Sequence, residues 1–189
     1  MVPQRAEQSR AVAKRRAILR AATELLYSEG LRGVTHRNVA AQAGAPVGSI
    51  GYYYSNRERL LATCFDGIAQ RRRELVDREL AGGAVSSDPA ELADLVVRVV
   101  AGGEIDHVAG LVTATVDVQH ESPELVSELT AHWRGVIEAV QKVLDAASFS
   151  DLTGRQVVRS LVGVAVCSLL NEDTSGAVVA LTEEILRGE

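Results

Sequence analysis

Residues 35–61 have the sequence THRNVAAQAGAPVGSIGYYYSNRERLL, and this stretch decides the fold of the chain. The hydroxyl of Thr35 can cap a short helix that runs to about Ala43. Gly44 follows where a left-handed residue closes a helix, and Pro46 can start a second short helix over residues 47–53. Two short helices joined by a tight glycine turn predict a helix-turn-helix unit.

The predicted helix pair has an inner face and an outer face. Val39, Ala43 and Ile50 are spaced to meet between the two helices. The residues left on the outer face of the second helix, where they could contact another molecule, are Val47, Ser49, Tyr52 and Tyr53.

In these residues the chain resembles the TetR family of transcriptional regulators. The pattern covers residues 12–62 and comprises Gly30, Thr35, Val39, Ala40, Ala43, Gly44, Gly48, Ile50, Tyr52, Arg57 and Leu60. Three positions depart from it, because the family usually has an aromatic residue at Gly51, a histidine at Tyr53 and a phenylalanine at Tyr54. Gly51 costs about 0.5–1 kcal/mol of helix stability relative to alanine, so we expect a loose second helix in the absence of DNA.

The resemblance implies an all-α regulator with two domains. A helix-turn-helix DNA-binding domain, residues 1–55, is joined by a long helix to a helical ligand-binding and dimerisation domain, residues 56–189. The expected partners are double-stranded DNA with an inverted-repeat operator, a second copy of the chain and a small-molecule effector, and most relatives are repressors. The expected DNA-binding residues are Thr35, Arg37, Pro46, Val47, Gly48, Ser49, Tyr52, Tyr53 and Arg57, with Thr35, Arg37 and Arg57 on phosphates.

The charge is distributed unevenly along the chain. Residues 1–80 hold 14 Lys and Arg against 8 Asp and Glu, and the remaining residues hold 6 against 17. A basic end on an acidic body indicates that only one end meets a polyanion such as DNA. The alternative is that these charged residues are ordinary solvent-exposed side chains that bind no polyanion.

The composition also indicates the cellular compartment in which the protein is expected. Two cysteines, Cys64 and Cys167, are too few for a disulfide framework. No stretch reaches the ~20 apolar residues of a membrane span, so we expect a soluble cytoplasmic protein.

Residues 1–9 are polar and lack periodicity, which predicts a flexible arm that either reaches DNA or does nothing. A helix is expected over about 11–28, closed by Gly30, and a long connecting helix over about 56–80. Arg71, Arg72 and Arg73 lie on the connecting helix and are expected on its solvated face.

Further helices are predicted over about 89–101, 106–120, 123–147, 153–170 and 177–186. Residues 123–147 and 153–170 stand where the family's dimer helices lie, and the second is apolar on more than one side, so it needs cover. The expected interface residues are Val126, Leu129, Val158, Leu161, Val162 and Leu169. The alternative is that residues 153–170 form the central helix of a monomeric bundle.

Only Trp133 and Phe149 among the aromatic residues lie beyond residue 66. A pocket in the second domain would therefore have aliphatic walls, which favours a small aliphatic or modestly polar effector over a flat aromatic one. The expected effector-binding residues are Phe65, Ile68, Leu111, Thr115 and Trp133.

No catalytic or cofactor motif is found, so neither an enzyme nor a cofactor is expected. The four histidines show no i, i+4 pair, and a metal role for His107, His120 and His132 or a redox role for Cys64 is the weaker interpretation. The competing function is a helical protein that binds a small molecule or a partner without operator DNA.

Overall fold

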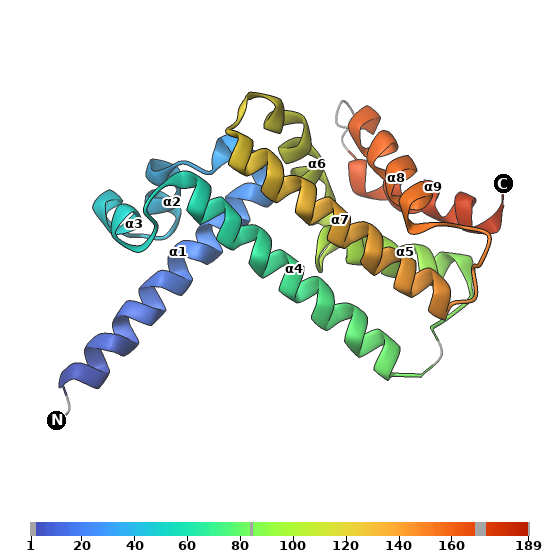
Figure 1. The fold of residues 1–189 in the computed structure, drawn as a ribbon, viewed down its shortest axis with the longest axis horizontal. Coiled ribbons are helices and arrows are strands. Elements are labelled where there is room, and N and C mark those ends of the chain that lie inside the picture. The colour runs from blue at the N-terminus through green and yellow to red at the C-terminus, as the bar shows by residue number, and fades with distance from the viewer. Residues whose placement is uncertain (1–2, 84, 169–172, 189) are drawn as a thin grey trace.

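The computed structural model describes residues 3–83, 85–168 and 173–188, and within them the chain forms helices and turns without a strand (Figure 1). The predicted all-α class is confirmed. The α-helices are α1 (Pro3–Gly33), α2 (His36–Gln42), α3 (Val47–Tyr53), α4 (Arg57–Ala81), α5 (Pro89–Ala101), α6 (Val108–Asp117), α7 (Pro123–Ala146), α8 (Gly154–Ser168) and α9 (Thr174–Arg187). Two 3-10 turns, η1 (Ile105–His107) and η2 (Val118–His120), flank α6.

The first helix begins earlier than expected. It starts at Pro3 rather than near Ala11, so residues 3–9 are helical where an irregular arm was expected. Proline is tolerated in the first turn of a helix, and no glycine interrupts the chain before Gly30. At Gly30 the backbone adopts φ 66° and ψ −158°, so the regular helix ends there as predicted and α1 resumes after a kink.

The helix-turn-helix unit forms as predicted. Thr35 Oγ1 accepts a hydrogen bond from the backbone N–H of Asn38 at 3.1 Å, and Gly44 has a left-handed φ of 59°. Pro46 is the cap residue before α3 rather than its first helical residue, because its ψ is 140°. Val39 and Ile50 are fully buried between the helices. The pair is therefore fixed on α1 by its inner face.

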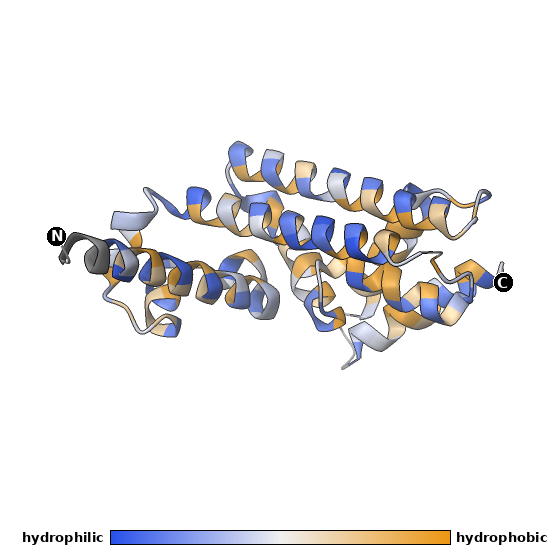
Figure 2. Cartoon of the chain, turned by 90° about the horizontal axis from the view of Figure 1, so that it is seen from below, coloured by the Kyte–Doolittle hydropathy of each residue, from blue (hydrophilic) through white to orange (hydrophobic). Residues whose placement is uncertain are grey.

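The long helix α4 links two apolar clusters. Asn56 caps it by accepting from the backbone N–H of Arg59 at 2.8 Å. The first half of α4 packs with α1 to α3, α6 and the start of α7, and its second half packs with α5, α7, α8 and α9. Figure 2 shows apolar colour gathered where the helices face one another. Packing is thus continuous across the expected boundary at residue 55.

The helices of the second half also follow the predicted order. Asp88 caps α5 and Ser122 caps α7, and each is followed by a proline at the start of the helix. The expectation that Arg72 is solvated is wrong, because its side chain is buried with 2% exposure. None of the helices in the described part of the chain combines the length and the apolar composition that crossing a membrane requires.

Candidate nucleic-acid interface

The outward face of α3 is exposed and unusually apolar. Tyr52 is 83% exposed and Val47 is 52% exposed, while Ser49 and Tyr53 are half-buried. The rings of Tyr52 and Tyr53 meet edge to face with centroids 5.1 Å apart. Large exposed side chains grouped on one helix indicate a contact surface for another molecule. All four residues expected on this face are therefore placed on it or at its margin.

The glycines of α3 keep this face open. A Cβ at Gly48 or Gly51 would meet no heavy atom within 4 Å, so neither glycine is required by packing inside the protein. Because glycine has no side chain, a second backbone can approach the helix closely at these two positions.

Tyr54, one of the three positions that depart from the family pattern, anchors the end of α3. It is 2% exposed, and the guanidinium of Arg15 on α1 lies 5.7 Å from the centre of its ring. Burial raises the pKa of the Tyr54 hydroxyl. The aromatic residue that closes α3 is thus part of the core beneath the exposed face.

Arg37 and Thr35, two of the three residues expected on phosphates, are at least partly exposed, and their contact with phosphates stays a prediction. Arg37 is exposed on α2. The Thr35 oxygen accepts the capping hydrogen bond, which leaves its hydroxyl hydrogen able to donate to a phosphate oxygen. Lys14 and Arg10 on α1 are also exposed, so cationic side chains extend along the same unit.

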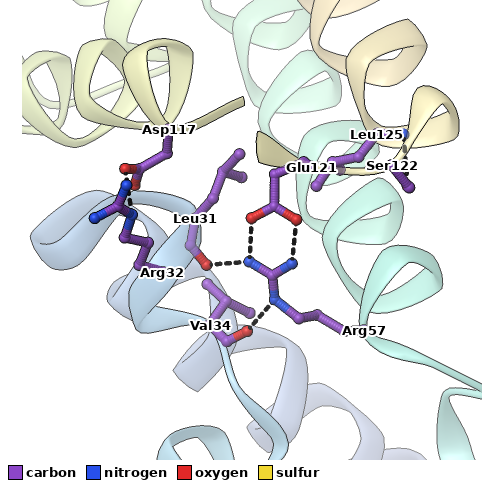
Figure 3. A network of polar contacts seen from close by, with 8 residues as sticks. All are labelled: Leu31, Arg32, Val34, Arg57, Asp117, Glu121, Ser122 and Leu125. Carbon is purple, nitrogen blue, oxygen red and sulfur yellow. Dashed lines mark hydrogen bonds and ion pairs between the residues drawn. The ribbon is translucent and has the colours of Figure 1, made fainter. Parts of the chain in front are cut away.

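Arg57 does not lie on this surface. Its Nε donates to the carbonyl of Val34 at 2.8 Å, and its Nη2 donates to the carbonyl of Leu31 at 2.6 Å (Figure 3). Its two amino groups also pair with the Glu121 carboxylate at 2.6 and 2.9 Å. The guanidinium is therefore committed to internal partners, and we no longer propose it as a phosphate contact.

Arg57 instead ties three parts of the chain together. It stands at the start of α4, Leu31 and Val34 belong to the end of α1 and the link to α2, and Glu121 precedes α7. A second ion pair, Arg32 Nε to Asp117 Oδ1 at 2.8 Å, lies nearby. The sequence could not reveal either pair, because the partners are far apart along the chain and each charge alone is typical of a solvated surface.

The end of α1 also packs very closely on α6. A Cβ at Gly110 would lie 1.9 Å from the carbonyl oxygen of Tyr27, and one at Gly30 would lie 2.8 Å from Thr113 Cγ2. The two backbones approach each other only because both positions are glycine. The end of α1 and α6 are therefore in direct backbone contact.

The expected effector-binding residues lie together, but side chains fill the space between them. Phe65, Ile68 and Leu111 are buried in one apolar cluster, and Trp133 Nε1 donates to Thr115 Oγ1 at 2.9 Å. Three open surface clefts, of about 480, 410 and 320 Å³, are lined by other residues. These five residues remain a prediction for an arrangement in which the cluster opens.

The expected interface residues divide into two groups. Val126 is 41% exposed and Val162 is half-buried, so both can meet a second copy. Leu129, Val158 and Leu161 are at most 3% exposed and pack inside the protomer, so they were wrongly assigned to a contact surface. Helical period identifies apolar faces but not which one turns inward. Leu169 lies outside the described residues.

The remaining histidines and cysteines form no metal site among the described residues. Tyr27 and His107 stack with ring centroids 3.6 Å apart, and His132 is buried beside Arg72. Burial raises the pKa of the Cys64 thiol to about 11, which disfavours the thiolate that a redox sensor needs.

Comparison with known proteins supports the same interpretation. Residues 18–64 match the family model described as bacterial regulatory proteins, tetR family. A comparison with curated proteins found no match. A TetR-family transcriptional regulator from Agrobacterium tumefaciens shares the fold with a TM-score of 0.75 and 16% identity, over 94% of this chain and 98% of that chain.

Two further solved structures are similar over most of their length. SCO7518 of Streptomyces coelicolor A3(2) has a TM-score of 0.59 and 25% identity, over 93% of this chain and 96% of that chain. The multidrug binding protein EbrR, complexed with ethidium, has a TM-score of 0.59 and 23% identity, over 93% and 97%. The helix-turn-helix unit is thus matched by the TetR family model over residues 18–64, and the described fold is similar to that of a TetR-family transcriptional regulator.

Proposed function

We propose that this protein is a dimeric repressor that binds an inverted-repeat operator and is released by a small-molecule effector. The observation that carries the proposal is the exposed face of α3, where Val47 and Tyr52 are 52% and 83% exposed. A helix of this kind, placed second in a helix-turn-helix unit, is the element that enters the major groove. Arg37 and Thr35 would hold the phosphates on either side.

The second domain would control this interface through α6. Gly110 holds α6 against α1, and the ion pairs of Arg32 with Asp117 and of Arg57 with Glu121 join the DNA-binding unit to the ends of α6 and α7. An effector that binds better to a shifted arrangement of α6 would therefore also tilt the unit that carries α3. By linkage, operator DNA would weaken effector binding by the same factor.

Dimerisation would use the exposed faces of α7 and α8. Val126 and Val166 are each 41% exposed, although valine is usually buried. A second copy that covers both would place two α3 helices on one side of the dimer. An inverted repeat with half-sites about one helical turn apart, ~34–36 Å, would match that symmetry.

The test measures binding of the full chain to DNA from the region upstream of its own gene. Binding is monitored by fluorescence anisotropy, with scrambled DNA as competitor. The full chain should bind the upstream DNA more tightly than the scrambled DNA, and Tyr52→Ala should remove most of that difference. A matched control is Val116→Ala, since Val116 is also exposed, at 46%, but lies on α6. If the full chain binds both DNAs equally weakly, the alternative of a helical binding protein without an operator is correct.

A further inference from the structure

Arg72 on α4 is a buried cation with no carboxylate partner among the described residues. It is 2% exposed. The arginines that form ion pairs in the described part of the chain are Arg20, Arg32, Arg57, Arg98 and Arg187. Because desolvation of a guanidinium is costly, an arginine in the interior requires compensation from a negative or strongly polar partner.

The end of α5 supplies part of that compensation. Arg72 Nε donates to the carbonyl of Val99 at 2.8 Å, and Nη2 lies 3.5 Å from the carbonyl of Val100. Both carbonyls belong to the last turn of α5, where the helix carries a partial negative charge. This capping role uses only one edge of the guanidinium, because Nη1 has no hydrogen bond to a described residue.

His132 on α7 also contacts Arg72. Its Nε2 lies 3.3 Å from Arg72 Nη2. Burial, reinforced by the Arg72 charge, lowers the pKa of His132 to about 3, so the ring is neutral. If Nε2 accepts from the arginine, the ring hydrogen is on Nδ1, which is buried and has no partner. Donors therefore outnumber acceptors around this arginine.

A small cavity lies at the same place, between α4 and α7. Its volume is about 140 Å³. The cavity therefore has room for a small organic group. Its lining combines Arg72 with aliphatic and small residues and with charged residues at the rim: Ala69, Val76, Gly135 and Ala139, then Arg73, Asp77, Glu138 and Lys142.

We propose that this cavity binds the carboxylate of a short aliphatic acid, with Arg72 as the residue that holds it. Nε and Nη2 of Arg72 already have partners, so Nη1 would be the nitrogen that donates to the carboxylate. Such charge-assisted hydrogen bonds are among the strongest in proteins. Val76 and Ala139 would cover the aliphatic part. The inference rests on the proposed function and deepens it, because it names the chemical class of the effector.

The test compares propionate with propionamide, which has the same shape and no charge. Binding to the full chain is followed by calorimetry and by the fluorescence of Trp133, which is next to His132, with sodium chloride at equal ionic strength as the control for unspecific anion effects. We expect saturable binding of propionate, and at least tenfold weaker binding of propionamide. Equal binding of the two, or the same response to chloride, would overturn the proposal.

Two variants distinguish the loss of propionate binding from the loss of the fold. Arg72→Met should abolish the preference for propionate, but the loss of the α5 cap could also unfold the protein. Gly135→Leu fills the cavity and leaves Arg72 intact, and a Cβ at Gly135 meets no heavy atom within 4 Å. It should weaken propionate binding at least tenfold with the helical circular dichroism unchanged. Gly67→Leu is the matched control, because Gly67 is on α4 outside this cavity lining and a Cβ there meets only the Arg71 side chain at 3.7 Å.

The outcomes for site and regulator are distinguishable. A chain that binds upstream DNA but shows no preference for propionate refutes only the carboxylate site. If the chain prefers propionate and Gly135→Leu loses that preference, the carboxylate site stands. If the same chain binds no operator, the proposed function as a regulator is refuted. Unchanged propionate binding in Gly135→Leu refutes the site whatever the DNA result.

Discussion

Arg57 at the start of α4 and Glu121 before α7 face each other, with Nη1 2.6 Å from Oε2 and Nη2 2.9 Å from Oε1. The hydrogen bonds from Arg57 lower the pKa of the Glu121 carboxyl. Because both side chains are largely shielded, with 24% and 16% exposure, the pair is worth more than an exposed one. It is the most direct polar link between the DNA-binding unit and α7.

Glu121→Gln should weaken this link. The arginine would keep its carbonyl partners but lose its counter-charge, so we expect the free energy of unfolding to fall by about 1–3 kcal/mol at pH 7. The depressed pKa means that this contribution is present above the ordinary pKa of a glutamate and is lost as the pH falls through the folded value. Urea denaturation at pH 7 and at pH 4 measures both effects. Glu124→Gln, on the exposed first turn of α7, is the control, and equal stability of the two variants would contradict the prediction.

Gly110→Ala should damage the contact of α1 with α6. The added Cβ would lie 1.9 Å from the Tyr27 carbonyl oxygen, so the helices must separate, at a cost of at least about 1–3 kcal/mol. Gly135→Ala is the matched change, because its Cβ enters open space and should stabilise α7 by about 0.5–1 kcal/mol. Thermal unfolding of both variants checks the signs. A Gly110→Ala protein as stable as the wild type would show that α6 does not press on α1.

The sequence predicted what depends on neighbours along the chain. The cap at Thr35 and the left-handed turn at Gly44 follow from local backbone chemistry, and both are present. The exposed face of α3 also follows, since Ile50 fixes the orientation of a short helix.

The sequence could not predict what depends on tertiary packing. Arg57 and Arg72 belong to types that are usually solvated, and only the folded chain shows one paired with Glu121 and the other capping α5. The same limit explains why Val158 and Leu161 were wrongly expected at the dimer interface. On a helix with two apolar faces, the partner that covers each face is decided by elements elsewhere in the chain.

Arg37→Ala should weaken DNA binding without regard to sequence. An exposed arginine that neutralises one phosphate contributes about one unit to the slope of log affinity against log salt concentration, so the slope should flatten by that amount. Anisotropy titrations over a range of salt concentrations, with upstream and scrambled DNA, measure this. Arg155→Ala, an exposed arginine on α8, should leave the slope unchanged. An unaltered slope in Arg37→Ala would remove α2 from the phosphate contacts.

His132 should make the fold sensitive to mild acid. Its pKa is about 3 in the folded chain, mainly because of burial, and about 6.5 in an unfolded one, so unfolding takes up a proton between these values. Stability is therefore highest above pH 6.5 and falls by about 1.4 kcal/mol per pH unit below it. His132→Gln should reduce this slope between pH 6.5 and 5, while His120→Gln, at an exposed position, should not. Parallel slopes for the wild type and His132→Gln would show that the histidine is already protonated in the folded protein.

Val166→Glu should separate dimerisation from folding. Val166 is 41% exposed on α8, so a glutamate there stays solvated in the monomer and is desolvated without a partner only when a second copy covers it, at a cost of several kcal/mol. Sedimentation should then show a folded monomer with unchanged helical circular dichroism. Val158→Glu is the contrasting change, because Val158 is 3% exposed and a charge there must be buried within the protomer itself. That variant should unfold or aggregate at any concentration, whereas a Val166→Glu protein that remains a dimer would place the interface away from this face of α8.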